Sequence, residues 1–385
     1  MNAPELTTEQ RLIQDTARRI ADEHFKPRAA AADKNFAPPI ENLQILAEHG
    51  FTGICIPTEY GGAGLGVFEM TLIVEQVARA CANTGILMSC TDGATARTIM
   101  HVGTAAMKQA YLPKFARGEL FAAWSMSEAN AGSDVGNVQT KAVRDGAHYV
   151  LNGAKLWCSG AQIADLFLVL VRFNADLGMR GVGAVLGDRG TPGFTIGKHL
   201  DLIGLRATGM AELVFEDCRV PIDNVILQAG DMRKLLRVLD QDRIAGNPPI
   251  CLGAAEAAFT DAVQHLRDRQ QFGRPLADNQ GLQWKLADMA IDLEGARALL
   301  YRAAQRCDAG TMTQMDASIA KTFVNEASIR VTNQAMQLAG ASGLSQEFAF
   351  ERHYRDVRGL AIGYGTTEIH RSVIAREILD GRYVV

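Results

Sequence analysis

Apolar residues in the first third of the chain recur at the spacing of a helix. Thr7 and Gln10 form the pattern of a capping box, and apolar side chains follow on one stripe, at Leu12, Ile13, Ala17, Ile20, Ala21 and Phe25. Similar patterns with short breaks continue to about Phe115. They predict an N-terminal helical domain over residues 1–120.

The pattern changes in the middle of the chain. Asp145-Gly146 and Asn152-Gly153 are dipeptides typical of hairpin turns. The runs 147–151, 166–171 and 213–215 have the composition of strands. Residues 121–230 are therefore predicted to form a β domain, whose last strand closes near Val220-Pro221.

Long helical patterns return after Asp231 and predict a third domain over residues 231–385. Its expected helices cover residues 239–269, 282–306, 317–338 and 366–379. The order is thus α, then β, then α, an α+β fold class. Two glycine clusters, 61–64 and 181–183, lack the full G-x-G-x-x-G spacing between a strand and a helix, so a Rossmann nucleotide site is not supported.

Composition narrows the class of protein. The chain has 385 residues, of which 48% are hydrophobic and 21% charged, with a net charge of -4. It can bury a large core in more than one unit. No start sequence or apolar run suggests export or a membrane span, so a cytoplasmic location is expected. Mild acidity without a basic block argues against nucleic acid and anionic membranes as partners.

The seven cysteines are scattered without a C-x-x-C pair or a Cys/His cluster. This argues against a metal site and against a disulfide framework. They are predicted to be reduced thiols, most of them buried.

Five separated motifs carry a resemblance to a known family. Residues 127–134, S-E-A-N-A-G-S-D, resemble the T-E-P-x-A-G-S-D signature of acyl-CoA dehydrogenases, and residues 152–159, N-G-A-K-L-W-C-S, are similar to N-G-x-K-x-W-I-[ST]. Further matches are R-Q-Q-F-G at 269–273 with Gln280, Glu351-Arg352 with Arg355-Asp356, and G-T-T at 365–367. Their order and spacing match over essentially the whole chain.

The resemblance implies a fold and an activity. The expected fold is an N-terminal helical domain, a middle β-barrel-like domain and a C-terminal four-helix bundle. The expected enzyme is an FAD-dependent oxidoreductase that acts on the CH–CH bond of an acyl-CoA thioester and passes electrons to an electron-transferring flavoprotein. A homo-oligomer is expected, a tetramer built as a dimer of dimers.

The resemblance also implies roles for single residues. Trp124 to Ser127 should face the polar edge of the flavin, Trp157 should pack on its ring, and the Ser159 hydroxyl should reach the nitrogen that accepts the hydride. From a neighbouring subunit, the expected FAD contacts are Arg269, Gln271, Phe272, Gln337 and Gly340, with Thr366 and Glu368 as the last ones. The expected substrate contacts are Ser133 near the pantetheine entrance, which is also counted with the cofactor site, Asp240, Arg243, Tyr364 and Gly365.

Each of these residues also has a plain structural interpretation. Alone, Trp157 is more often a core aromatic, Arg269 a solvated helix charge, and Ser127 or Ser133 a turn residue. Their joint spacing favours the functional interpretation.

The sequence departs from the family at the catalytic base. The chemistry needs a carboxylate aimed at the α carbon of the thioester, and many members carry a Glu directly before the final Gly-Thr. Here that residue is Tyr364, and a neutral phenol is no base near neutral pH. Tyr364 is instead expected to supply its main-chain amide to the thioester oxygen.

Two aspartates are candidates for the missing base. Asp242 lies one residue before Arg243, where another subset of the family carries its carboxylate, but it can also pair with Arg243 or Arg237 on a helix surface. Asp92 falls where the pocket floor is expected and resembles the Asp of ring-oxidising members, but it is also a good helix N-cap.

The leading hypothesis is therefore a dehydrogenase of a short, branched or cyclic acyl-CoA with Asp242 or Asp92 as base. The alternatives are a flavin-containing acyl-CoA lyase of the desulfinase kind, without net oxidation, and a catalytically silent flavoprotein. Flavin bleaching by acyl-CoAs without oxygen separates the first from the other two.

Overall fold

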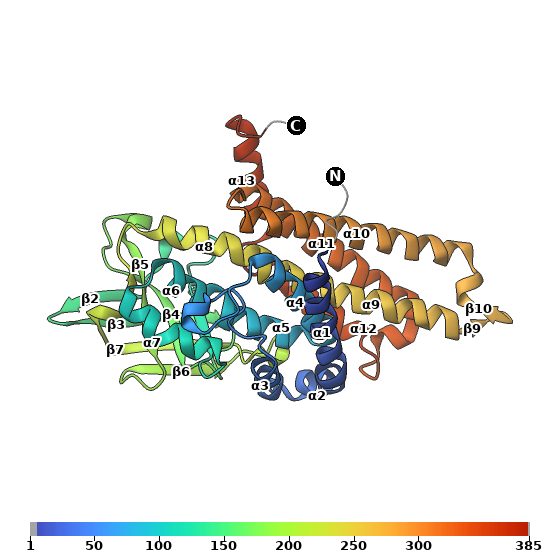
Figure 1. The fold of residues 1–385 in the computed structure, drawn as a ribbon, viewed down its shortest axis with the longest axis horizontal. Helices are drawn as coiled ribbons and strands as arrows, with labels where there is room; N and C mark the ends of the chain where they lie inside the picture. Colours follow the sequence, from blue (N-terminus) through green and yellow to red (C-terminus); the bar gives the residue numbers. More distant parts are fainter. Residues whose placement is uncertain (1–5, 384–385) are drawn as a thin grey trace.

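The computed structural model describes residues 6–383, which form a helical part, a sheet and a long bundle (Figure 1). The first helix begins as expected: the Thr7 hydroxyl accepts a hydrogen bond from the Gln10 amide at 3.2 Å, and the Gln10 side chain accepts one from the Thr7 amide at 3.0 Å. The helices of this part are α1 (Thr8–Ile20), α2 (Lys26–Asn35), α3 (Ile40–Glu48), α4 (Val67–Ala80), α5 (Ala82–Met88), α6 (Ala96–Val102) and α7 (Ala105–Ala116).

Two wide π-helical turns interrupt this helical part, at Ala21–Phe25 and at Ser89–Thr95. The second turn contains Gly93 with non-helical angles, φ -86° and ψ -115°. Turns of this type are frequent at functional sites, because they redirect side chains out of the helical register.

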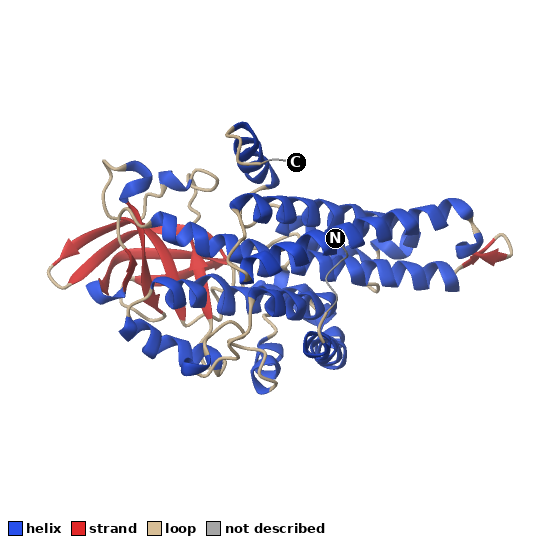
Figure 2. Ribbon diagram, turned by 45° about the horizontal axis from the view of Figure 1, so that its top comes forward, coloured by secondary structure: helices blue, strands red, loops and turns tan. Residues whose placement is uncertain are grey.

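The middle of the chain forms one mixed sheet (Figure 2). Its strands follow the order β6-β7-β3-β2-β4-β5-β8, and β1 pairs in parallel with β4. The strands are β1 (Ala122–Ser125), β2 (Lys141–Asp145), β3 (His148–Cys158), β4 (Leu166–Arg172), β5 (Val182–Asp188), β6 (Phe194–His199), β7 (Ala211–Pro221) and β8 (Val225–Leu227).

Strand β4 is buried on both faces and divides two apolar cores. Leu166, Leu168 and Leu170 face a core shared with α6, α7 and α8, while Phe167 and Val169 face a core within the sheet. A strand buried on both faces has a continuous apolar run rather than an alternating one. This burial fixes the sheet against the helices that carry the candidate site.

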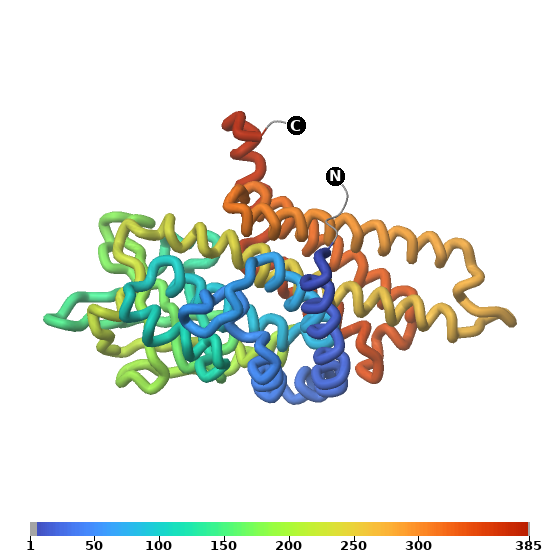
Figure 3. Tube along the Cα trace, viewed as in Figure 1, coloured from blue at the N-terminus to red at the C-terminus, as the bar shows by residue number. Residues whose placement is uncertain are grey.

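The last third of the chain is an antiparallel bundle with a small hairpin at its far end. Its elements are α8 (Met232–Ala245), α9 (Pro248–Asp268), β9 (Gln270–Gln271), β10 (Arg274–Pro275), α10 (Gln280–Asp308), α11 (Gln314–Ala339), α12 (Phe350–Leu360) and α13 (Thr367–Leu379). Helix α13 projects from the body of the molecule (Figure 1). The N-terminal helices pack on this bundle through one common core, in which α4 lies against α9 (Figure 3).

Two predictions about local structure were wrong. The single helix expected over 239–269 is two helices, because Pro248 and Pro249 lack the amide hydrogens needed to continue α8. Asn152-Gly153 is no turn but a bulge inside β3, where Asn152 pairs with the main chain of Asp217 at 2.9 Å. The Asp145-Gly146 turn between β2 and β3 is confirmed, whereas helix α12 was not predicted.

Arg355 and Asp356 of α12 join the three parts of the chain. Arg355 forms an ion pair with Asp33 of α2 at 2.7 Å, and its guanidinium also donates to the Ile203 carbonyl at 2.9 Å. The Asp356 carboxylate accepts a hydrogen bond from the Leu205 amide at 2.6 Å. This motif, which the sequence shares with the family, therefore contacts the first helices, the segment after β6 and the bundle.

The bulge in β3 gives a test of the sheet. A Cβ at Gly153 would come within 2.7 Å of the Thr140 main chain, and Gly153 has φ +147°. Gly153→Ala should therefore lower the apparent Tm by several degrees, since such strain costs about 1–3 kcal/mol. Gly187→Ala is the control, because nothing lies within 4 Å of its added Cβ, and its Tm should not fall. Equal Tm values for both variants would contradict the assigned bulge.

Candidate active site

Three elements bring charged side chains together in the interior. Helix α8 carries Asp242, the π-helical turn before α6 carries Asp92, and α6 carries Arg97. The loop between α12 and α13 adds Tyr364. The kink at Gly93 and the end of α8 place these elements against one another, since a Cβ on Gly93 would lie 3.2 Å from the Asp242 carboxylate.

Asp242 is completely buried, with 0% of its surface exposed. Its Oδ1 lies 3.4 Å from Nη1 of Arg97, and within the described residues neither carboxylate oxygen has a hydrogen-bond partner. Burial raises the pKa of Asp242 to about 7, against the opposing effect of Arg97 and then of Arg243. The expected surface pairing with Arg243 or Arg237 is therefore wrong: the partner is Arg97, from a distant part of the sequence.

Arg97 is buried to the same degree, with 1% exposed. Its Nη2 donates to the Cys55 sulfur at 3.6 Å, while Nε and Nη1 have no hydrogen-bond partner in residues 6–383. The sequence analysis did not single out this residue. The available signal was a single charged residue in the otherwise uncharged stretch Gly93 to Met100, which is unusual for a solvated charge.

Asp92 is a second buried carboxyl group on which Arg97 acts electrostatically. It is buried inside the π-helical turn and accepts a hydrogen bond from the Gly53 amide at 3.2 Å. Burial raises its pKa to about 7, opposed by the Gly53 hydrogen bond and by Arg97. The helix N-cap interpretation of Asp92 is wrong, because the residue lies within a helical turn and caps no helix.

Tyr364 is held by its main chain rather than by its phenol. It has φ +60°, and its carbonyl accepts from Arg243 Nε at 3.3 Å and lies 3.2 Å from His370 Nε2. The hydroxyl lies 3.4 Å from the Ser89 hydroxyl. Burial raises the pKa of the phenol above its ordinary value, with Cys90 and Asp242 adding to the effect. The side chain therefore stays neutral and is no base.

Lys321 fixes the rest of this loop. Its buried ammonium donates to the Gly365 carbonyl at 2.7 Å and to the Ala361 carbonyl at 3.1 Å. Burial lowers its pKa to about 8. Lys321 and His370 were both absent from the predicted site, and their signal was again a polar residue on the inner face of a helix.

Asp240 and Arg243, the predicted pantetheine contacts, form an ion pair on α8. Because Arg243 also donates to the Tyr364 carbonyl, this pair joins α8 to the loop before α13. Both side chains are largely but not completely buried, unlike that of Asp242.

The predicted flavin contacts of the sheet lie on β1, β3 and the segments that follow them. The Leu156 amide donates to the Ser127 carbonyl at 2.9 Å, which holds the two family-like motifs side by side. Trp157 has φ +61° at a bulge in β3 and is 56% exposed. The Trp124 ring lies 5.7 Å from the ring of Tyr364, so the sheet meets the candidate base site here. Ser159 is partly buried at the end of β3, and Ser133 is exposed.

A buried ion pair connects these two motifs. Lys155, on β3, pairs with Glu128 at 2.6 Å, and Glu128 also accepts from the Thr140 amide at 3.0 Å. Burial lowers the pKa of Lys155 to about 8. Glu128 belongs to the first motif and Lys155 to the second. Their ion pair thus has a structural role, because it fixes Ser127 and Trp157 relative to each other.

The other predicted cofactor contacts lie elsewhere in the chain. Arg269, Gln271 and Phe272 form the exposed tip of the bundle, at the opposite end from the sheet (Figures 1 and 2). Helix α9 has 21 residues and so places them about 30 Å from Asn247. Gln337 and Gly340 are exposed at the end of α11. Thr366 caps α13, accepting from the Ile369 amide at 3.3 Å, and Glu368 is exposed.

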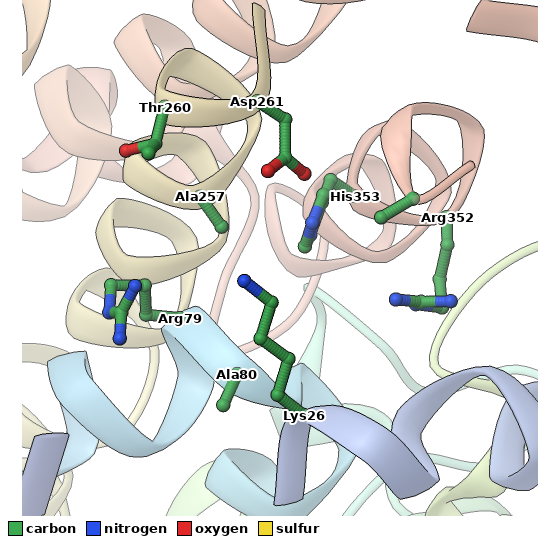
Figure 4. A pocket seen from close by; sticks show the side chains of 9 residues that line it. Lys26, Arg79, Ala80, Ala257, Thr260, Asp261, Arg352 and His353 are labelled. Atoms are coloured by element: carbon green, nitrogen blue, oxygen red, sulfur yellow. The ribbon is translucent and has the colours of Figure 1, made fainter. Parts of the chain in front are cut away.

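A further cavity lies between α4, α9 and α12 (Figure 4). Lys26, Arg79, Asp261 and His353 line it, and burial lowers the pKa of His353 to about 3, so its ring is uncharged. None of the candidate site residues lines this cavity.

Comparison with known families assigns the three parts of the chain. Residues 7–119, 123–218 and 235–379 match the profiles described as the N-terminal, middle and C-terminal domains of acyl-CoA dehydrogenase. The chain belongs to the acyl-CoA dehydrogenase family. The resemblance, the α+β fold and the enzyme class expected from the sequence are thereby confirmed.

Individual relatives agree over almost the full length. The short-chain specific acyl-CoA dehydrogenase of Clostridium acetobutylicum is 38% identical, covering 97% of this chain and 98% of that protein. Butyryl-CoA dehydrogenase from Megasphaera elsdenii is 34% identical with a TM-score of 0.94, covering 98% of this chain and 99% of that one. A chain in a structure of the electron transferring flavoprotein of Acidaminococcus fermentans is 36% identical with a TM-score of 0.95, covering 97% and 99%.

The geometry of Tyr364 leads to a test. Its carbonyl contacts are main-chain contacts, and its hydroxyl lies near the neutral side chains of Ser89 and Trp124. Tyr364→Phe should therefore keep the rate of flavin reduction by an acyl-CoA within about threefold, because the lost neutral hydrogen bond contributes only about 0.5–1.5 kcal/mol. Stopped-flow absorbance measures it. A loss of several orders of magnitude would mean that the phenol takes part in proton transfer.

Proposed function

We propose that the protein dehydrogenates a short acyl-CoA between its α and β carbons, with FAD as cofactor and Asp242 as the base. The observation that carries this proposal is the burial of Asp242 beside Arg97, in contact with the turn at Gly93 and near Tyr364. The pKa of about 7 suits a base at neutral pH, because a general base is most effective when its pKa lies near the working pH.

The residues of the sheet fit the cofactor of this family. FAD is the cofactor of the family, and when bound it supplies the acceptor for a hydride from the β carbon. On this chain, the Trp157 side chain is 56% exposed, so its indole offers an aromatic face on which a flavin could pack. The Ser127 and Ser159 hydroxyls offer donors beside it. The Asp242 carboxylate would take the α proton and become a carboxylic acid, so that the substrate loses one proton and one hydride.

The loop at Tyr364 supports the thioester in this proposal. Arg243, Lys321 and His370 hold the carbonyls of Tyr364 and Gly365, which fixes the orientation of the peptide units around them. We propose that the Tyr364 amide donates to the thioester oxygen, where charge develops as the α proton leaves. Asp240 and Arg243, towards solvent, are the proposed pantetheine contacts.

The relatives favour a short acyl group. Two of the proteins named above act, by their names, on short-chain acyl-CoA and on butyryl-CoA. A branched or cyclic acyl group remains a proposal that rests on the carboxylates at 242 and 92. An electron-transferring flavoprotein is the proposed electron acceptor, supported by the similarity to a chain in such a structure. A cytoplasmic location and the division at 120/121 and 230/231 also remain proposals.

A second copy of the chain is part of the proposal. The hairpin tip with Arg269 lies about 30 Å from the interior site, beyond the reach of a flavin held at Trp157 in the same subunit. Trp284 and Ile291, seven residues apart on α10, are largely exposed and present an apolar stripe on the bundle. We propose that this stripe packs on a second copy, so that each hairpin completes a neighbour's FAD site, and that four copies assemble.

Substitution of the two aspartates tests the base. Asp242→Asn should leave acyl-CoA binding within about threefold but reduce the rate of flavin bleaching at least about 10³-fold, because the amide cannot accept the α proton. The measurement is anaerobic mixing of the yellow protein with butyryl-CoA and other short acyl-CoAs. Asp92→Asn is the matched comparison and should change substrate preference only.

The pH dependence gives an independent check. The base acts in its ionised form, so the bleaching rate should fall about tenfold per pH unit below a pKa of about 7 and level off above it. If Asp92→Asn stops bleaching and Asp242→Asn does not, Asp92 is the base and a ring substrate is favoured. If both variants bleach at the wild-type rate, the dehydrogenase mechanism proposed here is wrong.

The role of the hairpin can be tested on the purified protein. Arg269→Ala should lower FAD occupancy, because a charge-assisted hydrogen bond to phosphate contributes about 1.5–3 kcal/mol. Arg267→Ala is the control, an exposed arginine two residues earlier on the same turn. Absorbance gives the flavin-to-protein ratio, and sedimentation gives the number of subunits. A wild-type monomer that retains its flavin would contradict the shared site.

A further inference from the structure

The buried pair of Arg97 and Asp242 leaves more polar atoms without partners than an interior normally tolerates. Two of the three guanidinium nitrogens of Arg97 and both oxygens of Asp242 lack a hydrogen-bond partner in the described chain. Buried polar groups are nearly always hydrogen-bonded, since each unsatisfied one costs free energy. A single 3.4 Å contact between the two groups does not satisfy them.

The elements around Arg97 supply further polar groups but no complete partner. Cys55 takes one N–H through its sulfur, a weak acceptor. Arg97 also acts electrostatically on the carboxyl group of Asp92, which accepts from the Gly53 amide through Oδ1. For its Oδ2, the described residues supply no hydrogen bond. The donors of Arg97 and the second oxygen of Asp92 therefore suit a ligand that accepts from one and donates to the other.

Given the proposed function, on which this step rests, that ligand is part of the acyl chain. Asp242 is assigned to the α carbon, and Arg97, 3.4 Å from Asp242, and Asp92 belong to the adjoining helix and turn. We propose that Arg97 and Asp92 recognise an uncharged hydroxyl substituent on the acyl chain beyond the β carbon.

Charge counting favours an uncharged substituent over a carboxylate. Arg97 carries one positive charge, and Asp242 must be ionised to act as a base, so this pair is neutral in the reactive state, and Asp92 adds a carboxyl group but no positive charge. A carboxylate on the acyl chain would place a second anion in the same buried space with no second cation to pair with it. The cationic side chain that stands next to Asp242 in sequence, Arg243, already pairs with Asp240. An unpaired buried charge is strongly unfavourable, whereas a hydroxyl adds none.

A matched series of thioesters tests the proposal on the wild-type holoenzyme. Pentanoyl-CoA, 5-hydroxypentanoyl-CoA and glutaryl-CoA have the same five-carbon chain and differ at its end, and butyryl-CoA with 4-hydroxybutyryl-CoA gives the same comparison one carbon shorter. At one or both lengths, kcat/KM for the hydroxylated chain should exceed that of the plain chain at least about tenfold, because a site that hydrogen-bonds a substituent rejects the analogue without it. Glutaryl-CoA should be the poorest of its three.

Arg97→Met shows whether this selectivity comes from the guanidinium. The substitution keeps an unbranched side chain, two atoms shorter than that of Arg, and removes the donors, so the ratio between hydroxylated and plain chains should fall to about one. The ratio is the readout because any change at the Asp242 base affects both substrates equally. Arg79→Met is the control. It removes another mostly buried arginine, which lines the cavity of Figure 4 and pairs with Asp22, and it should keep the ratio.

Three results would overturn the proposal: plain chains preferred at both lengths, glutaryl-CoA as the best substrate, or an unchanged ratio in Arg97→Met. If Arg97→Met does not fold, the substrate series on the wild-type enzyme still tests the proposal. If none of the thioesters bleaches the flavin, the proposed dehydrogenation fails. Dissociation constants measured on the same samples then test the subsite by itself, and equal constants for hydroxylated and plain chains would refute it.

Discussion

The relative position of the three domains depends on two adjacent residues of α12. Arg355 pairs with Asp33 at 2.7 Å and Asp356 accepts from the Leu205 amide at 2.6 Å, so one turn of helix contacts the N-terminal helices and the β domain at once. Gly204 makes this approach possible, because a Cβ there would lie 2.1 Å from the Arg355 carbonyl. The candidate site is built from all three domains, and a shift at this junction would separate its parts. Interior ion pairs of this kind add little net stability, but breaking one is costly, which makes the arrangement specific.

An ion pair between separate helices also lies in the interior of the site. The chain stops α8 with a proline pair and turns the preceding helix of the first domain at Gly93, and these two interruptions set Asp242 against Arg97. Neither group would be tolerated alone in the interior, because an isolated buried charge loses its hydration without compensation. The pair is nevertheless incompletely satisfied, unlike the Lys155–Glu128 pair beneath the flavin motifs, whose carboxylate is saturated by amides and a hydroxyl. The contrast separates a structural ion pair from one that we propose is arranged for a ligand.

The cofactor contacts expected from the sequence divide into two groups that one chain cannot bring together. Trp124, Ser127 and Trp157 lie on the sheet near Tyr364, whereas Arg269 lies at the end of a helix about 30 Å long. A rigid antiparallel bundle cannot fold back over that distance. Either a neighbouring copy supplies the second group or those residues have no role in the cofactor site. The exposed apolar stripe on α10 favours the neighbouring copy.

The sequence by itself determined the α, β, α order, the family and most element positions, because hydrophobic periodicity and motif spacing are local properties that hold before the chain folds. It also singled out Asp242 and Asp92. Only the tertiary structure decided their surroundings. The counterion of Asp242 is not its sequence neighbour Arg243 but Arg97, 145 positions away, and Asp92 caps no helix. Sequence spacing predicts contacts along one helix, whereas burial, which raises the pKa of both carboxylates to about 7, arises only when separate helices exclude water from between them.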